Sequence, residues 1–264
     1  MLEKNASLMN DAITQRVSRR SFDGQPLSEE QQAALRQFTA EDLGVARLRT
    51  HFVHRSGGLD HVYRGVVGSY GKITGSSALL AFTAASDDTW AADMECGYAG
   101  EQYVLLAESL GLGSCWNGGM FGVKELMGLV PLGPHERVVS IIALGKAVTG
   151  EDRLGKLAKL VFRRKSVEQI ASQALLEAPG YMRGALEAVR VAPSAVNRQP
   201  WFLHQGADGE VVLTATRQGG LVNVDLGIAM LHFRVSVLSQ GLSGRWEAQS
   251  PSRAVFWLAR ETSP

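Results

Sequence analysis

The feature that most constrains this chain is an internal repeat with a constant offset of 130 residues, from Gly97 to Gly227. The segment MECGYAGEQYVLLAESLGLGSCW, which starts at Met94, matches VDLGIAMLHFRVSVLSQGLSGRW, which starts at Val224. Identical residues stand at equivalent positions: Gly97 and Gly227, Ala99 and Ala229, Gly111 and Gly241, Leu112 and Leu242, Trp116 and Trp246. Self-similarity at a fixed offset indicates that one structural unit occurs twice.

The apolar spacing predicts that each copy of this segment is a long helix. The Gly-Leu pair near its end is typical of a helix C-terminus, where glycine adopts the left-handed conformation. The early glycine and alanine would let another backbone approach closely, because they have little or no side chain.

The two halves also agree upstream of these helices. Residues 33–54 and 184–204 each predict a helix, a loop and an apolar strand. Ser28, with Gln31 three positions later and Leu27 before it, predicts the capped start of the first helix of the first unit. Further strands are predicted for Ser77–Ala85, Arg137–Gly145, Glu210–Thr216 and Ala254–Arg260.

These patterns predict an α+β fold made of two tandem related units, residues 1–160 and 161–264. No Pro/Gly/Ser-rich linker separates them, and the connection TGEDRLGKLAKLVFRRKS is charged and partly amphipathic. We expect two such units to share a face and to behave as a dimer fused into one chain, an internal pseudo-dimer with a core of long helices and antiparallel-rich sheets.

Composition limits the function classes that need consideration. The net charge of +1 over 264 residues gives no bulk attraction to nucleic acid or to an anionic membrane. The N-terminus has no apolar stretch of signal-peptide length, and no run reaches the 18 apolar residues of a membrane span, so we expect a cytoplasmic protein. Two cysteines without a C-x-x-C pair, and six histidines without H-x-x-x-H spacing, predict no disulfide framework and no metal site.

Most familiar enzyme motifs are missing. The stretch GLGSCWNGG matches no G-x-G-x-x-G fingerprint and follows a predicted helix, whereas a dinucleotide-binding turn follows a strand. The chain has neither a P-loop nor a nucleophile elbow. What remains is a set of anion-binding and amide-rich segments.

Three basic segments are candidates for anion binding. In RVSRRSF, alternation along an extended segment places Arg16, Ser18 and Arg20 on one side, which suits a phosphate or a polar ring edge. The alternative is a solvated basic arm. Lys72 stands just before a predicted buried strand, where it could reach into a site at the start of the strand, or it could be an ordinary exposed loop lysine. Arg163 and Arg164 could add phosphate contacts, and a charged linker explains them equally well.

The stretch RVAPSAVNRQPW, residues 190–201, is the most unusual one. Ser194, Asn197 and Gln199 offer hydroxyl and amide groups on a bend that two prolines stiffen, and Trp201 would add a flat apolar surface. Such a loop suits a heterocycle with alternating N and C=O groups. Ending a helix would account for part of this pattern, but not for three such groups within six positions.

RVSRRSF, APSAVNRQPW, GYAGEQYVLLAESLGLGSCW and VSIIALGKA together resemble the flavin-dependent nitroreductase family over nearly the whole chain. The order differs from the usual one, in which the loop follows the arm by about thirty residues. Here that place reads FTAEDLGVARLR, without the serine, asparagine and glutamine, and the loop lies in the second unit. The chain therefore resembles a single-chain, fused sub-group, and we expect one FMN per chain and a degenerate twin site.

Carried over position by position, the resemblance implies a set of FMN-binding residues. Arg16, Ser18 and Arg20 match the arm that holds the phosphate and pyrimidine edge, Lys72 and Ser69 match contacts near the pyrimidine, and Arg164 matches a phosphate contact. Gly118 and Gly119 match a glycine segment beside the isoalloxazine. The loop residues implied are Pro193, Ser194, Ala195, Asn197 and Gln199.

The resemblance implies an FMN-dependent NAD(P)H oxidoreductase. NADH or NADPH would reduce FMN, and a nitroaromatic, quinone or similar small acceptor would then take the hydride, with no catalytic side chain and no metal. Two alternatives stay open: a non-catalytic FMN-binding protein for storage or sensing, and a structural protein with an empty cleft. Because the pseudo-dimer interface would be internal, we expect a monomer, with a dimer possible.

Overall fold

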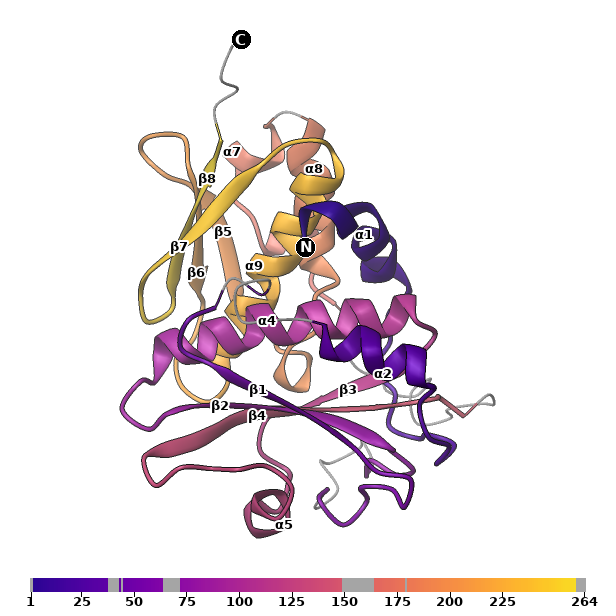
Figure 1. The fold of residues 1–264 in the computed structure, drawn as a ribbon. Coiled ribbons are helices and arrows are strands. Elements are labelled where there is room, and N and C mark those ends of the chain that lie inside the picture. The colour runs from indigo at the N-terminus through magenta and orange to yellow at the C-terminus, as the bar shows by residue number, and fades with distance from the viewer. Residues whose placement is uncertain are drawn as a thin grey trace. The chain divides into compact units, whose positions relative to one another are not determined.

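The computed structural model describes residues 2–37, 43, 45–63, 72–148, 164–178 and 180–259. The chain forms two compact units that do not follow its order. Unit 1 comprises residues 1–14, 93–102 and 164–264, and unit 2 comprises residues 15–92 and 103–163. Figure 1 shows the elements of both units.

Unit 2 is built on a four-stranded antiparallel sheet with the order β1-β2-β4-β3. Its strands are β1 (Arg49–His54), β2 (Ala78–Ala85), β3 (Gly113–Asn117) and β4 (Glu136–Gly145). The helices that accompany them are α2 (Glu29–Arg36), α5 (Val123–Met127) and both ends of α4 (Trp90–Ser109). The predicted strands Ser77–Ala85 and Arg137–Gly145 are therefore confirmed.

Both faces of this sheet carry apolar side chains. On one face, Leu79 and Ile141 are fully buried and belong to a core cluster with Leu126 of α5 and Leu59. On the other face, the Phe82 ring lies 6.2 Å from that of Tyr103 of α4 and stacks on Trp116. Burial on both faces explains why β2 and β4 read as nearly continuous apolar runs.

Unit 1 contains a second four-stranded antiparallel sheet, with the order β5-β6-β8-β7. Its strands are β5 (Trp201–Gln205), β6 (Val211–Ala215), β7 (Gly244–Ser250) and β8 (Arg253–Leu258). Its helices include α1 (Ala6–Gln15), η3 (Val167–Gln169), α7 (Gln173–Leu176), α8 (Gly180–Arg190), η4 (Ala195–Asn197) and α9 (Val222–Ser239). The predicted strands Glu210–Thr216 and Ala254–Arg260 are confirmed, and the two sheets repeat one strand order.

Two long helices meet in unit 1 at the repeated glycines. A Cβ atom on Gly97 of α4 would overlap the carbonyl oxygen of Val224, and one on Gly227 of α9 would overlap the carbonyl oxygen of Met94. Met94 and Val224 are themselves repeat-equivalent, so the contact is reciprocal, as in a two-fold interface. The fold class and the two antiparallel sheets match the sequence prediction, and the reciprocal contact is what a pseudo-dimer would show.

The ends of these helices also agree with the sequence. Gly111 and Gly241 both have positive φ, 72° and 77°, directly after α4 and α9. The Leu112 amide donates to the Ala107 carbonyl, and the Leu242 amide donates to the Val237 carbonyl, as in a Schellman cap. At the start of α2, Ser28 and Gln31 form the predicted capping box.

Some elements were not predicted. A helix, α1, precedes the capped helix α2, and strands β3 and β7 follow the two long helices at places for which the sequence analysis predicted no strand. Helix α9 has the length and apolar composition of a membrane-crossing helix, but 78% of that window is buried inside the fold. It is therefore the core helix of unit 1, which accounts for its composition.

Candidate functional site

The N-terminal arm runs along the edge of the sheet in unit 2. The Arg19 amide donates to the Ser114 carbonyl of β3 at 2.8 Å, and Thr74 exchanges backbone hydrogen bonds with Arg20 and Phe22. These bonds use the backbone of the arm and not its side chains. The extended conformation predicted for RVSRRSF is therefore present, held by isolated bridges to β3, to residue 147 after β4 and to residue 74.

The side chains of the arm gather positive charge around β3. Arg16 donates from Nη2 to the Ser18 hydroxyl at 3.3 Å. Burial raises the pKa of the Cys115 thiol on β3, and the nearby charges of Arg20 and Arg16 oppose that rise. Arg16 and Ser18 thus lie together. That Arg20 lies on the same side of the arm stays a prediction.

A tight turn at the end of β3 contains the two candidate glycines. Asn117 is 7% exposed, and its side-chain oxygen accepts from the amides of Gly119, at 3.3 Å, and Met120, at 2.7 Å. Its amide group donates to the Met120 carbonyl at 2.9 Å. Gly119 is exposed, and a Cβ atom there would meet nothing within 4 Å. Asn117, which the sequence analysis did not single out, therefore shapes the turn that carries Gly118 and Gly119.

The structure gives less support to two other candidates, Lys72 and Ser69. The Lys72 side chain is exposed and lies in an irregular segment, six residues before β2. Ser69, like Arg163 of the linker, lies outside the described residues. Their proposed contacts with a cofactor stay predictions.

Loop 193–199 in unit 1 has an unusual backbone. Val196, Asn197 and Gln199 have φ values of 47°, 55° and 47°, in the left-handed region that favours glycine. For a β-branched residue such as Val196 this conformation is a true outlier. Strained backbones of this kind persist only where the surroundings hold them, and they concentrate at ligand sites.

Internal hydrogen bonds close the loop on itself. The backbone amide of Gln199 donates to the Ser194 hydroxyl at 2.8 Å, and the backbone amide of Asn197 donates to the Ser194 carbonyl at 3.0 Å. The Ser194 oxygen acts here as an acceptor, so its hydroxyl proton can still be donated to a ligand. Pro193 is buried, whereas Ser194, Ala195 and Asn197 are half-buried.

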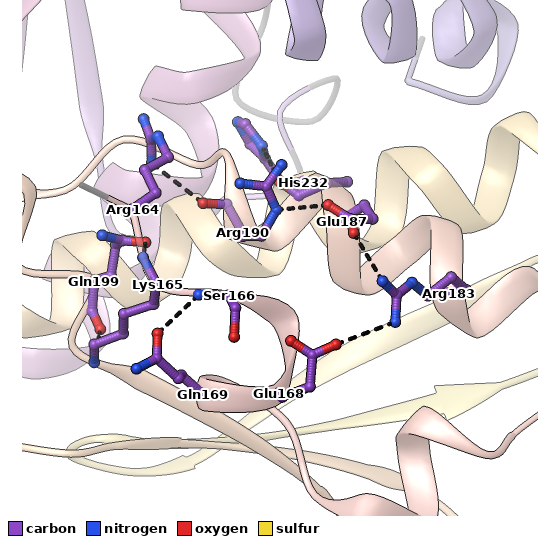
Figure 2. Close-up of polar contacts among 11 residues, drawn as sticks. Arg164, Lys165, Ser166, Glu168, Gln169, Arg183, Glu187, Arg190, Gln199 and His232 are labelled. Atoms are coloured by element: carbon purple, nitrogen blue, oxygen red, sulfur yellow. Dashed lines mark hydrogen bonds and ion pairs between the residues drawn. The ribbon is translucent and has the colours of Figure 1, made fainter. Parts of the chain in front are cut away.

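Contacts from other parts of unit 1 hold both ends of the loop, and Figure 2 shows the contacts of Arg164 with Arg190 and of Lys165 with Gln199. Arg164 donates from Nη1 to the Ala192 carbonyl at 2.6 Å and to the Arg190 carbonyl at 3.3 Å. The Lys165 amide donates to the Gln199 side-chain oxygen at 3.0 Å, and Lys165 Nζ donates to the Gln199 carbonyl at 2.8 Å. Gln199 is 1% exposed, so its side-chain amide is buried beneath the loop and supports it.

The middle of the loop is fixed by helix α9. Asp225, in the first turn of α9 and 3% exposed, accepts from the Ala195 amide at 2.8 Å. Burial raises the pKa of Asp225 to about 7, against the lowering effects of the Ala195 hydrogen bond and the Arg198 charge. Trp201, expected to offer a flat surface beside the loop, is instead fully buried in the core of unit 1.

The donor set of these segments fits FMN. The arm carries two guanidinium groups and a hydroxyl, which suit a phosphate, and the loop carries a hydroxyl and amides, which suit the carbonyls and nitrogens of a ring. The arm and the glycine turn belong to unit 2, and the loop and Arg164 belong to unit 1. Among the described residues, no three His, Cys, Asp or Glu side chains lie together as metal ligands would.

A family model described as "Putative TM nitroreductase" matches residues 9–237. Among solved structures, a nitroreductase of Thermotoga maritima is 20% identical with a TM-score of 0.64, and the match covers 94% of this chain and 92% of that one. This likeness shows a shared fold along nearly the whole chain.

Two shorter matches have lower scores. A nitroreductase family protein of Clostridium difficile is 14% identical with a TM-score of 0.44, covering 63% of this chain and 97% of that one. A nitroreductase with bound FMN from Bacteroides fragilis is 18% identical with a TM-score of 0.40, covering 54% and 90%. A search of the curated proteins found no match.

Proposed function

This chain belongs to the nitroreductase family, and on that premise we propose that it is an FMN-dependent oxidoreductase that uses NADH or NADPH to reduce a small acceptor such as a nitroaromatic or a quinone. The observation that carries the proposal is the strained loop 193–199. A loop with three left-handed non-glycine residues, fixed at both ends and in its middle, is preorganised for a ligand.

We propose distinct tasks for the two sets of donors. The guanidinium groups of Arg16 and Arg20 would bind the phosphate of FMN, together with the Ser18 hydroxyl. The Ser194 hydroxyl and the side-chain amide of Asn197 would bind the polar edge of the ring. Arg164 holds two backbone carbonyls of its own unit, and its contact with the phosphate is the remaining part of this proposal.

Bound FMN would supply the hydride-transfer chemistry, and the protein would supply binding, orientation and charge. A cation near the N1 and C2 carbonyl of the ring would favour uptake of a hydride, and Lys72 is the proposed source of that charge. The exposed Gly119 leaves open space at the turn, which would let an acceptor approach. No side chain needs to form a bond with the substrate.

The test is the visible spectrum of the purified protein, with released flavin counted per chain, before and after anaerobic addition of NADH or NADPH. We expect about one FMN per chain and bleaching by at least one donor. FMN that stays oxidised with both donors would favour storage or sensing. Protein that neither contains nor takes up FMN would refute the proposed site.

The first prediction concerns the two donor sets. Arg20→Ala and Asn197→Ala should each weaken FMN binding about tenfold to a hundredfold, because each removes a hydrogen bond to a polar or charged group. Arg245→Ala, at an exposed position of β7, is the matched control and should leave the affinity unchanged. Full retention of FMN in both site variants would contradict the assignment.

A further inference from the structure

The strained loop is held by residues outside it, and their contacts go beyond what ending a helix requires. The Asp225 carboxylate holds the Ala195 amide just before the first left-handed residue, Val196. Lys165 holds Gln199, the last left-handed residue, through both its backbone amide and its ammonium group. The strained stretch is therefore fixed on either side.

We propose that Asp225 and Lys165 are positioning residues, which hold loop 193–199 in the conformation that presents Ser194 and Asn197 to the flavin. This inference rests on the proposed function. It assigns neither residue a contact with the ligand. The sequence singled out neither one, because an aspartate in the first turn of a helix and a lysine in a charged linker are both ordinary.

The strain itself supports this role. A left-handed conformation is unfavourable for a non-glycine residue. The loop contains three such residues, and among them only Arg198 has ordinary dihedral angles. Hydrogen bonds within the loop join its own atoms, so they move with it and cannot anchor it to the unit. In the described part of the chain, Asp225 of α9 and Lys165 make hydrogen bonds from outside the loop that can do that.

The charges around Asp225 agree with a holding role. Arg198 of the loop is the charged group that acts on it, and burial raises the pKa of its carboxyl group. The hydrogen bond from Ala195 needs only an oxygen acceptor, which an amide also provides. Asp225→Asn therefore keeps the anchor and removes the charge, whereas Asp225→Ala removes both.

The loop can be tested without any ligand by amide hydrogen exchange. In the ligand-free protein, Asp225→Ala should remove the protection of the Ala195 amide, and Asp225→Asn should retain it. Ser236→Ala, at another buried polar position of α9, is the control and should leave this amide unchanged. Equal protection of Ala195 in all the variants would overturn the role of Asp225.

Affinities for FMN and for riboflavin, which lacks the phosphate, separate positioning from phosphate binding. Lys165→Met should weaken the binding of both ligands by the same factor, about threefold to tenfold, and Lys165→Arg should restore it. A loss confined to FMN would mean that Lys165 binds the phosphate instead. Asp225→Ala should likewise weaken both ligands about tenfold or more, with rescue by Asp225→Asn.

The failure of this inference is distinguishable from failure of the proposed function. Wild-type protein that binds neither flavin would refute the function, and hydrogen exchange at Ala195 would still decide whether Asp225 holds the loop. For Lys165, the corresponding measurement without ligand is hydrogen exchange at the backbone amide of Gln199 in Lys165→Met. Should Asp225→Ala fail to fold, Asp225→Asn with weakened binding of both flavins and an unprotected Ala195 amide would overturn the inference, because that variant keeps the acceptor.

Discussion

Strands β3 and β7 occupy equivalent places in the two sheets but end in different ways. Trp116 of β3 pairs with Ile142, and its repeat-equivalent Trp246 of β7 pairs with Phe256. One residue further along, β3 ends at Asn117, whose side chain binds the amides of the following turn. At that position β7 has the exposed Glu247 and continues to Ser250.

The connections after these two strands differ even more. Residues 118–135, including α5, connect β3 to β4, whereas β7 and β8 are joined by residues 251–252 alone. The sheets and the helix crossing are therefore alike, and the differences lie where strands end. Helix and strand interiors must pack, so both copies keep them, whereas the ends are free to gain or lose a binding element.

The largest expected effect on stability is at the crossing of α4 and α9, to which both copies of the repeat contribute. Gly97→Ala and Gly227→Ala should each destabilise the protein by about 4 kcal/mol or more, because the new Cβ atom would overlap a backbone carbonyl that cannot turn aside. Urea unfolding would measure the loss. Because the contact is reciprocal, the two losses should be similar.

The control for both glycines is Gly180→Ala at the start of α8, where a Cβ atom would meet nothing within 4 Å. It should change the free energy of unfolding by less than about 1 kcal/mol, since only helix propensity and chain entropy change. A loss at Gly97 with none at Gly227 would show that the helix crossing is not reciprocal.

A smaller effect is expected where the two long helices differ. Asp225 of α9 is buried, whereas the equivalent Glu95 of α4 is half-buried. Burial raises the pKa of Asp225 from 3.8 to about 7, so between these values the folded chain holds a proton that the unfolded chain releases. Stability should therefore fall as the pH rises through this window, by about 2–3 kcal/mol between pH 5 and pH 8.

Denaturation at several pH values would test this, with Asp225→Asn as the comparison. The variant cannot titrate at this position, so its stability should fall less than that of the wild type over the same range. Identical pH profiles for the two proteins would be the contrary result.

The smallest expected effect concerns the strand ends. Asn117→Ala should cost about 2 kcal/mol, because it removes three side-chain hydrogen bonds that organise the turn after β3. Glu247→Ala, at the equivalent exposed position, should stay within about 0.5 kcal/mol. Thermal unfolding of the pair would reveal the difference, and equal losses would mean that Asn117 does not shape the turn.

Much of the fold could be predicted from the sequence because its signals are local. The capping box at Ser28, the Gly-Leu helix ends and six strands follow from short-range chemistry, and the structure confirms them. Strands β3 and β7 were missed because each begins within five residues of the end of a long helix, and because their serine, glycine and charged residues do not predict a strand. Their pairing with β4 and β8 is a long-range effect.

The candidate site was predictable in its residue types and less so in their surroundings. Ser194 and Asn197 lie on a strained loop, as the short polar groups suggested, and Arg16 and Ser18 lie together. The contact between Asp225 and Ala195 joins residues thirty positions apart, which no motif reveals. Trp201 was misassigned to the surface, because sequence alone does not distinguish a stacking surface from a core ring.

The way unit 1 is assembled bears on synthesis by the ribosome. Unit 2 has all its residues once position 163 has emerged, whereas unit 1 begins with residues 1–14 and 93–102 and needs residues 164–264. At about 5–20 residues per second, the remaining stretch takes roughly 5–20 seconds to translate. During that interval the apolar side chains of Met9 and Ile13, buried in the finished fold, have no partners from residues 164–264. We expect nascent chains stalled near position 163 to depend on chaperones more than the finished protein does.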